Sequence, residues 1–298
     1  MNKFVVRQSL ILFMAATVWG VAFVAQSVGM DYVGPYTFIA VRNIVALAVL
    51  IPCAIFMNKG RKKRDTEACH QKENKKALVI GGICCGICLF TASTLQQFGV
   101  KYTTVGKAGF ITAMYLVLVP VFGIFLKKKT GLKVWISVAL ASLGLYLLCI
   151  TKGDFQLQKG DIYMLGCAAV FAVHILVVDH FSPLVDGVKL SCVQTFTNVV
   201  FGGIMMLLLE QPHLSDIFAA WLPIVYAGAL SSGVGYTFQI IGQKGMNPTA
   251  ACLILSLESV ISVLAGWLLL HQTLTTRELL GCVLAFAAII LVQLPERK

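Results

Sequence analysis

The sequence predicts an all-α membrane protein whose ten transmembrane helices form two inverted repeats of five helices each. Composition is the first observation behind this prediction: 58% of the 298 residues are hydrophobic, 12% are charged, and the mean hydropathy is +0.85. Soluble domains carry about 25% charged residues, so this chain has too few polar residues to cover a globular surface. Since about 20 apolar residues cross the hydrocarbon core as a helix, the length allows about ten spans and no soluble domain.

An internal repeat is the second observation. Residues 94–123 align without gaps with residues 237–266, at an offset of 143 residues. The alignment pairs Thr94, Gln96, Gly99, Lys101, Ala108, Ile111, Val117 and Gly123 with Thr237, Gln239, Gly242, Lys244, Ala251, Ile254, Val260 and Gly266. We therefore divide the chain into two repeats, residues 1–152 and residues 153–298. Five spans in each half insert the second half upside down, and inverted repeats of this kind are typical of secondary transporters.

Ten apolar segments account for the predicted helices. In chain order they are residues 9–28, 35–57, 77–100, 103–126, 134–150, 161–181, 191–210, 217–241, 249–270 and 277–294. Lys3 and Arg7 before the first segment resemble the start of a signal peptide. However, Trp19, Phe23 and Gln26 leave no small-residue cleavage site, and a second apolar segment follows at once. The first segment is therefore expected to be retained as a helix.

Prolines mark the two helix starts that the sequence defines best. Pro35 opens the second segment, and a proline in the first turn costs a helix no hydrogen bond. Asn247 and Pro248 provide a cap and a first-turn proline at the start of the ninth segment. Between the second and third segments, the polar loop of residues 58–76 has no apolar periodicity, so we expect a flexible cytoplasmic connector.

Basic residues predict the orientation. With the N-terminus inside, 18 Lys and Arg residues fall on the inner side and four on the outer side. The positive-inside rule then places both termini in the cytoplasm, in a multi-pass protein of the inner (plasma) membrane. The same rule explains the net charge of +11 without a nucleic-acid partner. The expected partners are the lipid bilayer and a small-molecule substrate, and the expected state is a monomer or a homodimer.

Cysteine usage indicates neither a disulfide framework nor a metal site. Nine of the ten cysteines lie in apolar segments, where a thiol acts as a small hydrophobic group, and Cys69 lies in the basic loop. Cys85 and Cys88 have the spacing of a redox or metal motif, but no histidine accompanies them, so we favour packing. No cofactor is expected.

Several short motifs follow one another along the chain. They are Gln96-Gln97-Phe98-Gly99, Lys101-Tyr102-Thr103-Thr104, Lys107-Ala108-Gly109-Phe110, Ser256-Leu257-Glu258 and Gly266-Trp267-Leu268, with Trp19-Gly20 in the first segment and Arg42 in the second. With the length and the duplication, this pattern resembles the EamA family of the drug/metabolite transporter superfamily over the whole chain. The resemblance implies a central cavity lined mainly by the first, third, fourth, sixth, eighth and ninth helices, and export of amino acids or related small metabolites.

Two positions depart from the family pattern. The family commonly has Leu-Glu-Pro where this chain reads Leu257-Glu258-Ser259, and a Gly-Glu pair where it reads His271-Gln272. Because a proline kinks a helix, we expect a straighter ninth helix here. Because one candidate proton carrier is missing, one-proton antiport through Glu258 and facilitated diffusion both stay open.

Glu258 is the main candidate for substrate binding and proton coupling. It lies about nine residues, or about 14 Å, into the ninth segment, near the bilayer midplane. A carboxylate at this depth is disfavoured by about 2–4 kcal/mol unless it is paired, hydrated or protonated, so it should face the bundle interior. Its partner in the repeat alignment is Tyr115, which predicts two polar groups that face one another. A structural hydrogen bond between helices is the alternative.

Two cations lie in the apolar segments. Lys107, about one turn inside the outer end of the fourth segment, either extends its ammonium to the interface or binds a substrate carboxylate at the outer mouth. Arg42 lies about seven residues into the second segment. Because the second helix is peripheral in the family, we favour a structural ion pair or a headgroup contact over substrate binding.

Polar residues share one face of the eighth segment. Tyr236, Gln239 and Gln243 have helical spacing, and the repeat places Gln96 opposite Gln239. These side chains either bind polar substrate atoms or join helices where no water competes. In the first segment Trp19 is a further candidate for the binding site, against packing or lipid contact.

The residues favour transport over other membrane functions. His174 is isolated from other potential metal ligands, so we expect a neutral buried histidine, with a proton relay to Glu258 as the alternative. No catalytic pair is apparent, so an enzyme is not expected, and no P-loop indicates an ATP-driven pump. A nucleotide-sugar or phosphorylated-metabolite exchanger of the same superfamily and a membrane scaffold remain as alternatives.

Overall fold

The computed structural model describes residues 3–64, 74–103, 105–127, 131–149, 159–270 and 275–293, and all regular secondary structure in these ranges is helical. The first half contains α1 (Lys3–Gly29), α2 (Pro35–Arg64), α3 (Lys75–Tyr102), α4 (Val105–Ala113), α5 (Tyr115–Phe125) and α6 (Leu132–Cys149). The second half contains α7 (Lys159–Phe181), α8 (Gly187–Leu209), α9 (Leu214–Ala219), α10 (Trp221–Val225), the π-helix η1 (Tyr226–Gly235), α11 (Tyr236–Gln243), α12 (Pro248–Leu255), α13 (Leu257–Leu270) and α14 (Thr276–Gln293).

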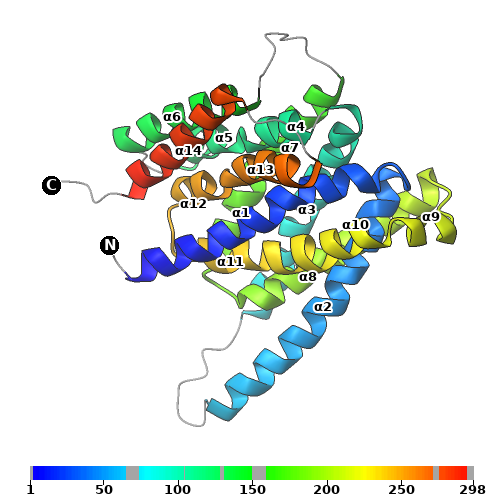
Figure 1. Ribbon diagram of the computed structural model, residues 1–298. Helices are drawn as coiled ribbons and strands as arrows, with labels where there is room; N and C mark the ends of the chain where they lie inside the picture. Colours follow the sequence, from blue (N-terminus) through cyan, green and yellow to red (C-terminus); the bar gives the residue numbers. More distant parts are fainter. Residues whose placement is uncertain are drawn as a thin grey trace.

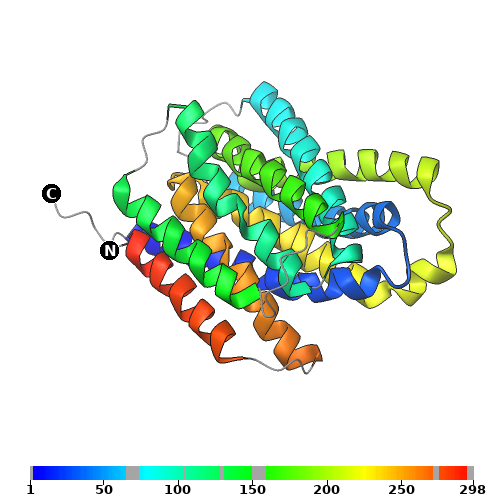
Figure 2. The ribbon, with the colours of Figure 1, turned by 90° about the horizontal axis from the view of Figure 1, so that it is seen from above.

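The helices form one bundle with α1 running through its middle (Figure 1). α1 packs against α13, α11 and η1, which belong to the other half of the chain. The two halves also meet where α3 packs on α7 and α8, and where α6 packs on α14. Seen from above, the first turn of α1 and the last turn of α14 lie at the same side of the bundle (Figure 2). The centre is therefore built from both halves.

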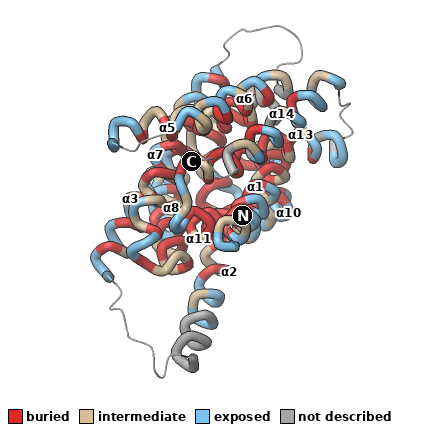
Figure 3. The backbone as a smooth tube through the Cα atoms, turned by 90° about the vertical axis from the view of Figure 1, so that its left-hand side faces the viewer, coloured by how far each residue is buried: buried red, intermediate tan, exposed pale blue. Residues whose placement is uncertain are grey.

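Each predicted apolar segment corresponds to one or more helices in the described residues. Eight helical stretches there are long and apolar enough to cross a membrane, and two shorter apolar helices, within residues 132–144 and 279–288, correspond to the fifth and tenth predicted segments. This supports a multi-pass membrane protein, whereas the number of ten complete spans stays a prediction. Buried residues gather along the axis of the bundle, and exposed residues lie on its outward faces (Figure 3). Many of the exposed residues are large and apolar, as expected for side chains that face lipid.

Two of the predicted continuous helices are interrupted at equivalent places. The fourth segment breaks at Met114 between α4 and α5, and the ninth breaks at Ser256 between α12 and α13. With the repeat offset of 143, the two breaks coincide to within one residue. Each half therefore contributes one broken helix to the core, a feature that places polar backbone at membrane depth in transporters.

The expectation of a straighter ninth helix is wrong. Although proline is absent, the helix breaks at Ser256, whose hydroxyl donates to the carbonyl of Leu253 at 2.8 Å. The backbone N–H of Ser259 bonds to the carbonyl of Ser256 at 3.1 Å, a tight three-residue bond in place of the usual four-residue one. A serine hydroxyl that bonds to a backbone carbonyl of the preceding turn often bends a helix.

The eighth predicted segment is also irregular. It divides into α10, η1 and α11, and η1 is a π-helix of ten residues. π-helical turns are rare and concentrate at functional sites. Gly228 in η1 permits a close approach to α2, because a Cβ on Gly228 would lie 2.5 Å from the carbonyl oxygen of Arg42. The irregular segment therefore packs directly on the part of α2 that carries this arginine.

Both helix starts marked by proline are confirmed. α2 begins at Pro35, and the carboxylate of Glu210, the C-cap residue of α8, accepts the backbone N–H groups of Tyr36 and Thr37 at 3.0 and 2.8 Å. Asn247 caps α12, because its side chain accepts the backbone N–H of Thr249 at 2.9 Å, and Pro248 occupies the first turn. Capping bonds of this kind satisfy backbone donors that the helix leaves free.

Candidate functional site

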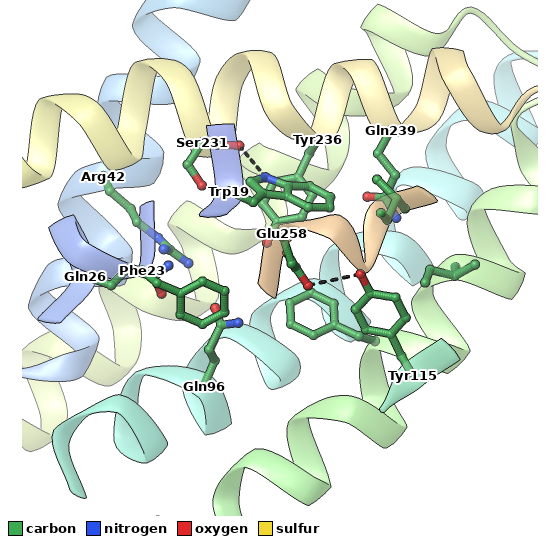
Figure 4. Close-up of a pocket in the computed structure, with 13 residues that line it drawn as sticks. Trp19, Phe23, Gln26, Arg42, Gln96, Tyr115, Ser231, Tyr236, Gln239 and Glu258 are labelled. Carbon is green, nitrogen blue, oxygen red and sulfur yellow. Dashed lines mark hydrogen bonds between the residues drawn. The ribbon is translucent and has the colours of Figure 1, made fainter. Parts of the chain in front are cut away.

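A pocket in the middle of the bundle collects most of the polar candidates (Figure 4). Its lining comes from both halves of the chain: Trp19, Phe23 and Gln26 of α1, Arg42 of α2, Gln96 of α3, Tyr115 of α5, Phe171 and Ile175 of α7, Ser231 of η1, Tyr236 and Gln239 of α11, Leu255 of α12 and Glu258 of α13. These nine elements fall in seven of the predicted segments, and six of the seven are those that the family resemblance implies. The second segment, which contains α2, is an addition.

Glu258 and Tyr115 form the polar centre of the pocket. The Tyr115 hydroxyl donates to a carboxylate oxygen of Glu258 at 3.0 Å, across a sequence separation of 143 residues (Figure 4). Their exposed fractions are 4% and 3%. The prediction that these repeat partners face one another is confirmed by this contact, which joins the two halves of the chain at equivalent positions.

The two helix breaks place this pair. Tyr115 begins α5 directly after the break at Met114, and Glu258 lies in the first turn of α13 directly after the break at Ser256. Because the N-terminus of a helix carries a partial positive charge, the start of α13 favours a negative side chain at this depth. The backbone therefore supplies part of the stabilisation that a carboxylate loses when it leaves water.

Close packing of α1 against α13 fixes the backbone of Glu258. A Cβ on Gly20 would lie 2.7 Å from the carbonyl oxygen of Glu258 and 2.6 Å from the Cβ of Ile261. Only glycine permits this approach, since real Cβ atoms do not come so near to such atoms. Ser259, which stands where the family has proline, donates to the carbonyl of Gly109 in α4 at 2.7 Å. The segment around Glu258 is thus held from two sides.

Aromatic rings form one wall of the pocket. The Trp19 indole N–H donates to the carbonyl of Ser231 at 3.2 Å, and its ring lies 4.8 Å from that of Tyr236, centre to centre. The Ser231 carbonyl belongs to η1, where the irregular backbone makes it available to a side chain (Figure 4). Trp19 therefore lies in the pocket with Phe23 and Gln26; Phe23 and Gln26 are buried and Trp19 is partly buried.

The structure separates the polar residues of the eighth segment by role. Gln239 lines the pocket, as does Gln96, its partner in the repeat. Gln243 instead donates to the carbonyl of Ile175 in α7 at 3.3 Å, which joins two helices. The side-chain oxygens of Gln239 and Gln26 are buried without a hydrogen-bond partner among the described residues. Unsatisfied buried acceptors of this kind cost about 1–3 kcal/mol each.

Arg42 makes neither of the two contacts that the sequence favoured for it, an ion pair or a headgroup contact, in the described residues. It is 98% buried, so a contact with lipid headgroups is excluded, and within the described chain no carboxylate forms an ion pair with it. Its guanidinium lies 5.7 Å from the ring centre of Phe38, and its side chain lines the pocket (Figure 4). An arginine in a buried segment was the available signal, but the peripheral position of the second helix in the family argued against it.

His174 lies behind the pocket and does not line it. It is fully buried, its Nε2 lies 3.3 Å from the side-chain oxygen of Gln194, and its ring meets that of Tyr236 at 6.2 Å. No hydrogen bond joins His174 to Glu258 in the described residues. The histidine is thus a packed core residue that adjoins the Tyr236 wall.

Several predicted residues lie outside the part of the chain that can be described. Lys107 belongs to α4, but its side chain is outside the described residues, as are Gln272, His271 and Cys69. Cys85 and Cys88 are free thiols, and the described residues contain no group of three or more potential metal ligands from His, Cys, Asp and Glu.

The pocket is narrow in this conformation. The space that the centre of a water molecule can occupy is about 20 Å³, room for about one ordered water. A ligand as large as an amino acid requires the walls to separate. The lining residues belong to both halves of the chain.

Comparison with known proteins agrees with this architecture. A 29% identical relative from Archaeoglobus fulgidus, described as an uncharacterized transporter, covers 95% of this chain and 84% of its own length. The uncharacterized transporter YoaV of Bacillus subtilis is 22% identical, over 90% of each chain. A solved crystal structure with 17% identity covers 96% of both chains with a TM-score of 0.77, which shows the fold.

The family model of the EamA-like transporter family matches the chain twice, over residues 7–150 and 158–294. Each match covers one of the two internal repeats. The motifs around Glu258 and Tyr115, the broken helices and the pocket between the halves all lie within these matched segments. The chain therefore belongs to the EamA-like transporter family, within the drug/metabolite transporter superfamily.

Proposed function

We propose that the protein is a secondary transporter that exports small polar metabolites such as amino acids by alternating access. The observation that supports this most is the buried hydrogen bond between Glu258 and Tyr115. It joins equivalent positions of the two repeats inside the pocket, at the place where a substrate would cross the midplane. Transporters built from inverted repeats bind their substrates at this interface.

The pocket supplies the interactions that a small polar solute needs. Glu258, Gln239 and Gln26 present oxygen acceptors, Arg42 presents a donor, and Trp19, Phe23 and Tyr236 present aromatic surface. Binding sites of mainly apolar character with a few placed polar groups are typical of small-molecule ligands. Gln96, Tyr115 and Lys107 complete the proposed set, with Lys107 at the outer mouth.

The wider assignment follows from the same architecture. In this proposal, residues 1–152 and 153–298 are the two rocking repeats, ten spans cross the plasma membrane, and both termini are cytoplasmic. Proton coupling through Glu258 is one mode of operation, and facilitated diffusion is the other. A nucleotide-sugar exchanger is less favoured, because Arg42 is the one cation among the described lining residues and such substrates carry two phosphates.

Metabolite profiling tests the proposal without a guess about the substrate. Cells that overproduce the wild-type protein should accumulate at least one small polar metabolite in the medium, compared with cells that carry an empty vector. Glu258→Gln keeps the shape of the side chain and removes its charge, so it should abolish the excess. Asp216→Asn, which changes a carboxylate in α9 away from the pocket, is the matched control and should retain it.

Equal media from wild-type and empty-vector cells, with the protein present in the membrane, would contradict export. An excess that persists in Glu258→Gln would instead show that the carboxylate is a structural residue.

A further inference from the structure

Arg42 carries a charge that nothing in the described protein neutralises. It lies in the middle of the bundle, and no ion pair within 4 Å reaches it from a described carboxylate. Its Nε is buried without a hydrogen-bond partner in the described residues. A buried charge of this kind is strongly unfavourable unless it meets an opposite charge, so the position points to an anionic group that arrives from outside the chain.

The surroundings hold Arg42 in the pocket and away from the membrane surface. The ring of Phe38 lies against the guanidinium at 5.7 Å, a cation–π distance. On the other side η1 packs against the backbone of Arg42 at Gly228. The guanidinium lies near Phe23 and Gln26 in the pocket (Figure 4). Helix α2 is therefore built to present this cation inwards.

Glu258 occupies a separate part of the same pocket. Its carboxylate points to Tyr115, while the guanidinium of Arg42 points to the region of Phe23 and Gln26 (Figure 4). An arginine and a carboxyl group thus line one pocket, yet no ion pair joins them in the described residues. A cationic and an acidic side chain that stay apart within one pocket match a ligand that carries both an anionic and a cationic group.

We propose that Arg42 is the anion subsite of the pocket and Glu258 its cation subsite, so that the protein selects substrates that carry a carboxylate and an ammonium group together. This inference rests on the proposed transport function and adds the residue that recognises the anionic end. The planar guanidinium suits a carboxylate, because it donates parallel hydrogen bonds. The ammonium end then donates to Glu258 and to the free side-chain oxygen of Gln239.

A substrate with only one charged group does not account for both Arg42 and Glu258 in the pocket. A substrate with only an ammonium group would leave Arg42 without an anionic partner. A carboxylic acid without an amine would leave Glu258 without a cationic partner. Each therefore binds less well than the molecule that carries both. Hydrogen bonds to charged groups contribute about 10- to 100-fold to binding, which sets the expected preference.

The test uses three matched classes of solute in proteoliposomes: L-amino acids, their amides, which lack the carboxylate, and the corresponding 2-hydroxy acids, which lack the amine. Each side chain occurs in all three classes, and efflux is followed by mass spectrometry. Wild-type protein should move the amino acids at least about tenfold faster than either analogue. Arg42→Gln should reduce amino-acid efflux to the rate of the amides without changing the amide rate, and Arg42→Lys should restore part of it, since it keeps the charge and loses the planar fork.

Arg277→Gln is the matched control. Arg277 also lies against an aromatic ring, 5.4 Å from the centre of Tyr146, but it is outside the pocket. This variant should retain the wild-type preference.

Three outcomes would overturn the inference. If wild-type protein moves the amides or the hydroxy acids as fast as the amino acids, two-charge recognition is wrong while transport stands. If Arg42→Gln lowers all three classes alike, the arginine is structural. If wild-type protein moves none of the three classes, the proposed substrate class is wrong as well. This result is distinct from a failure of the Arg42 assignment, because it is seen with the unmutated protein.

Discussion

Replacing Gly20 with alanine should loosen the contact between α1 and α13 that supports Glu258. The added Cβ would lie 2.6 Å from the Cβ of Ile261 and 2.7 Å from the carbonyl oxygen of Glu258, about 1 Å closer than optimal contacts. Neither neighbour is the flexible end of a side chain, so the helices must separate. Overpacking costs about 1–3 kcal/mol, and the better helix propensity of alanine returns up to about 1 kcal/mol. The expected loss of stability is about 1–2 kcal/mol.

Thermal unfolding of the purified protein in detergent measures this effect. For large chains about 1 kcal/mol shifts the midpoint by roughly 2–4 °C, so the apparent Tm of Gly20→Ala should fall by roughly 2–8 °C. Gly203→Ala is the matched control, because a Cβ at Gly203 in α8 meets no atom within 4 Å. It should leave the Tm unchanged or raise it slightly. If both variants unfold at the wild-type temperature, the close approach of α1 to α13 is wrong, and with it the account of how Glu258 is held.

Three further predictions concern topology, the outer mouth and coupling. Cys69 should react with a membrane-impermeant thiol reagent only after cells are opened, because the basic loop of residues 58–76 is expected in the cytoplasm; labelling on intact cells would reverse the orientation. Lys107→Met should leave maximal flux close to that of the wild type if the lysine only reaches the interface, whereas a loss of apparent affinity for a carboxylate-bearing substrate would assign it to the outer mouth. An imposed pH gradient should change wild-type efflux and leave Glu258→Gln unaffected if the carboxylate carries a proton; wild-type flux that ignores the gradient, after correction for ionisation of the substrate itself, would favour facilitated diffusion.

The internal repeat was the most informative part of the sequence. It predicted the division into two halves and the pairing of Tyr115 with Glu258, and the structure confirms that pairing as a hydrogen bond. Gln96 and Gln239 were likewise paired by alignment, and both line the pocket. Alignment succeeds here because a duplicated fold places equivalent residues at equivalent depths around the shared centre.

Irregular backbone could not be predicted in the same way. The break at Ser256 depends on a hydroxyl that bonds to Leu253, and serine is common in unbroken membrane helices. The π-helix η1 has no proline, and its glycines have a second explanation in close helix packing. Hydropathy describes how apolar a segment is. It does not indicate where the backbone hydrogen bonds change from the α-helical pattern to a tighter or wider one.

Arg42 shows a second limit. The apolar segment placed it inside a helix, but did not indicate that its side chain lines a pocket with residues from the other half of the chain. Those residues are far apart in the sequence, and only the three-dimensional arrangement brings them together. The consequence is large, because it changes a supposed structural arginine into a proposed binding residue.

The most direct test of the central claim is substrate efflux from proteoliposomes that contain purified wild-type protein, Glu258→Gln or Asp216→Asn. The substrate is the metabolite identified by profiling of the medium, and the amount of folded protein in each preparation is matched by size-exclusion chromatography. We expect efflux from wild-type and Asp216→Asn vesicles at similar rates, and efflux at the rate of protein-free vesicles from Glu258→Gln. If vesicles with folded Glu258→Gln protein release the substrate at the wild-type rate, the claim that the pocket between the repeats is the transport site is contradicted.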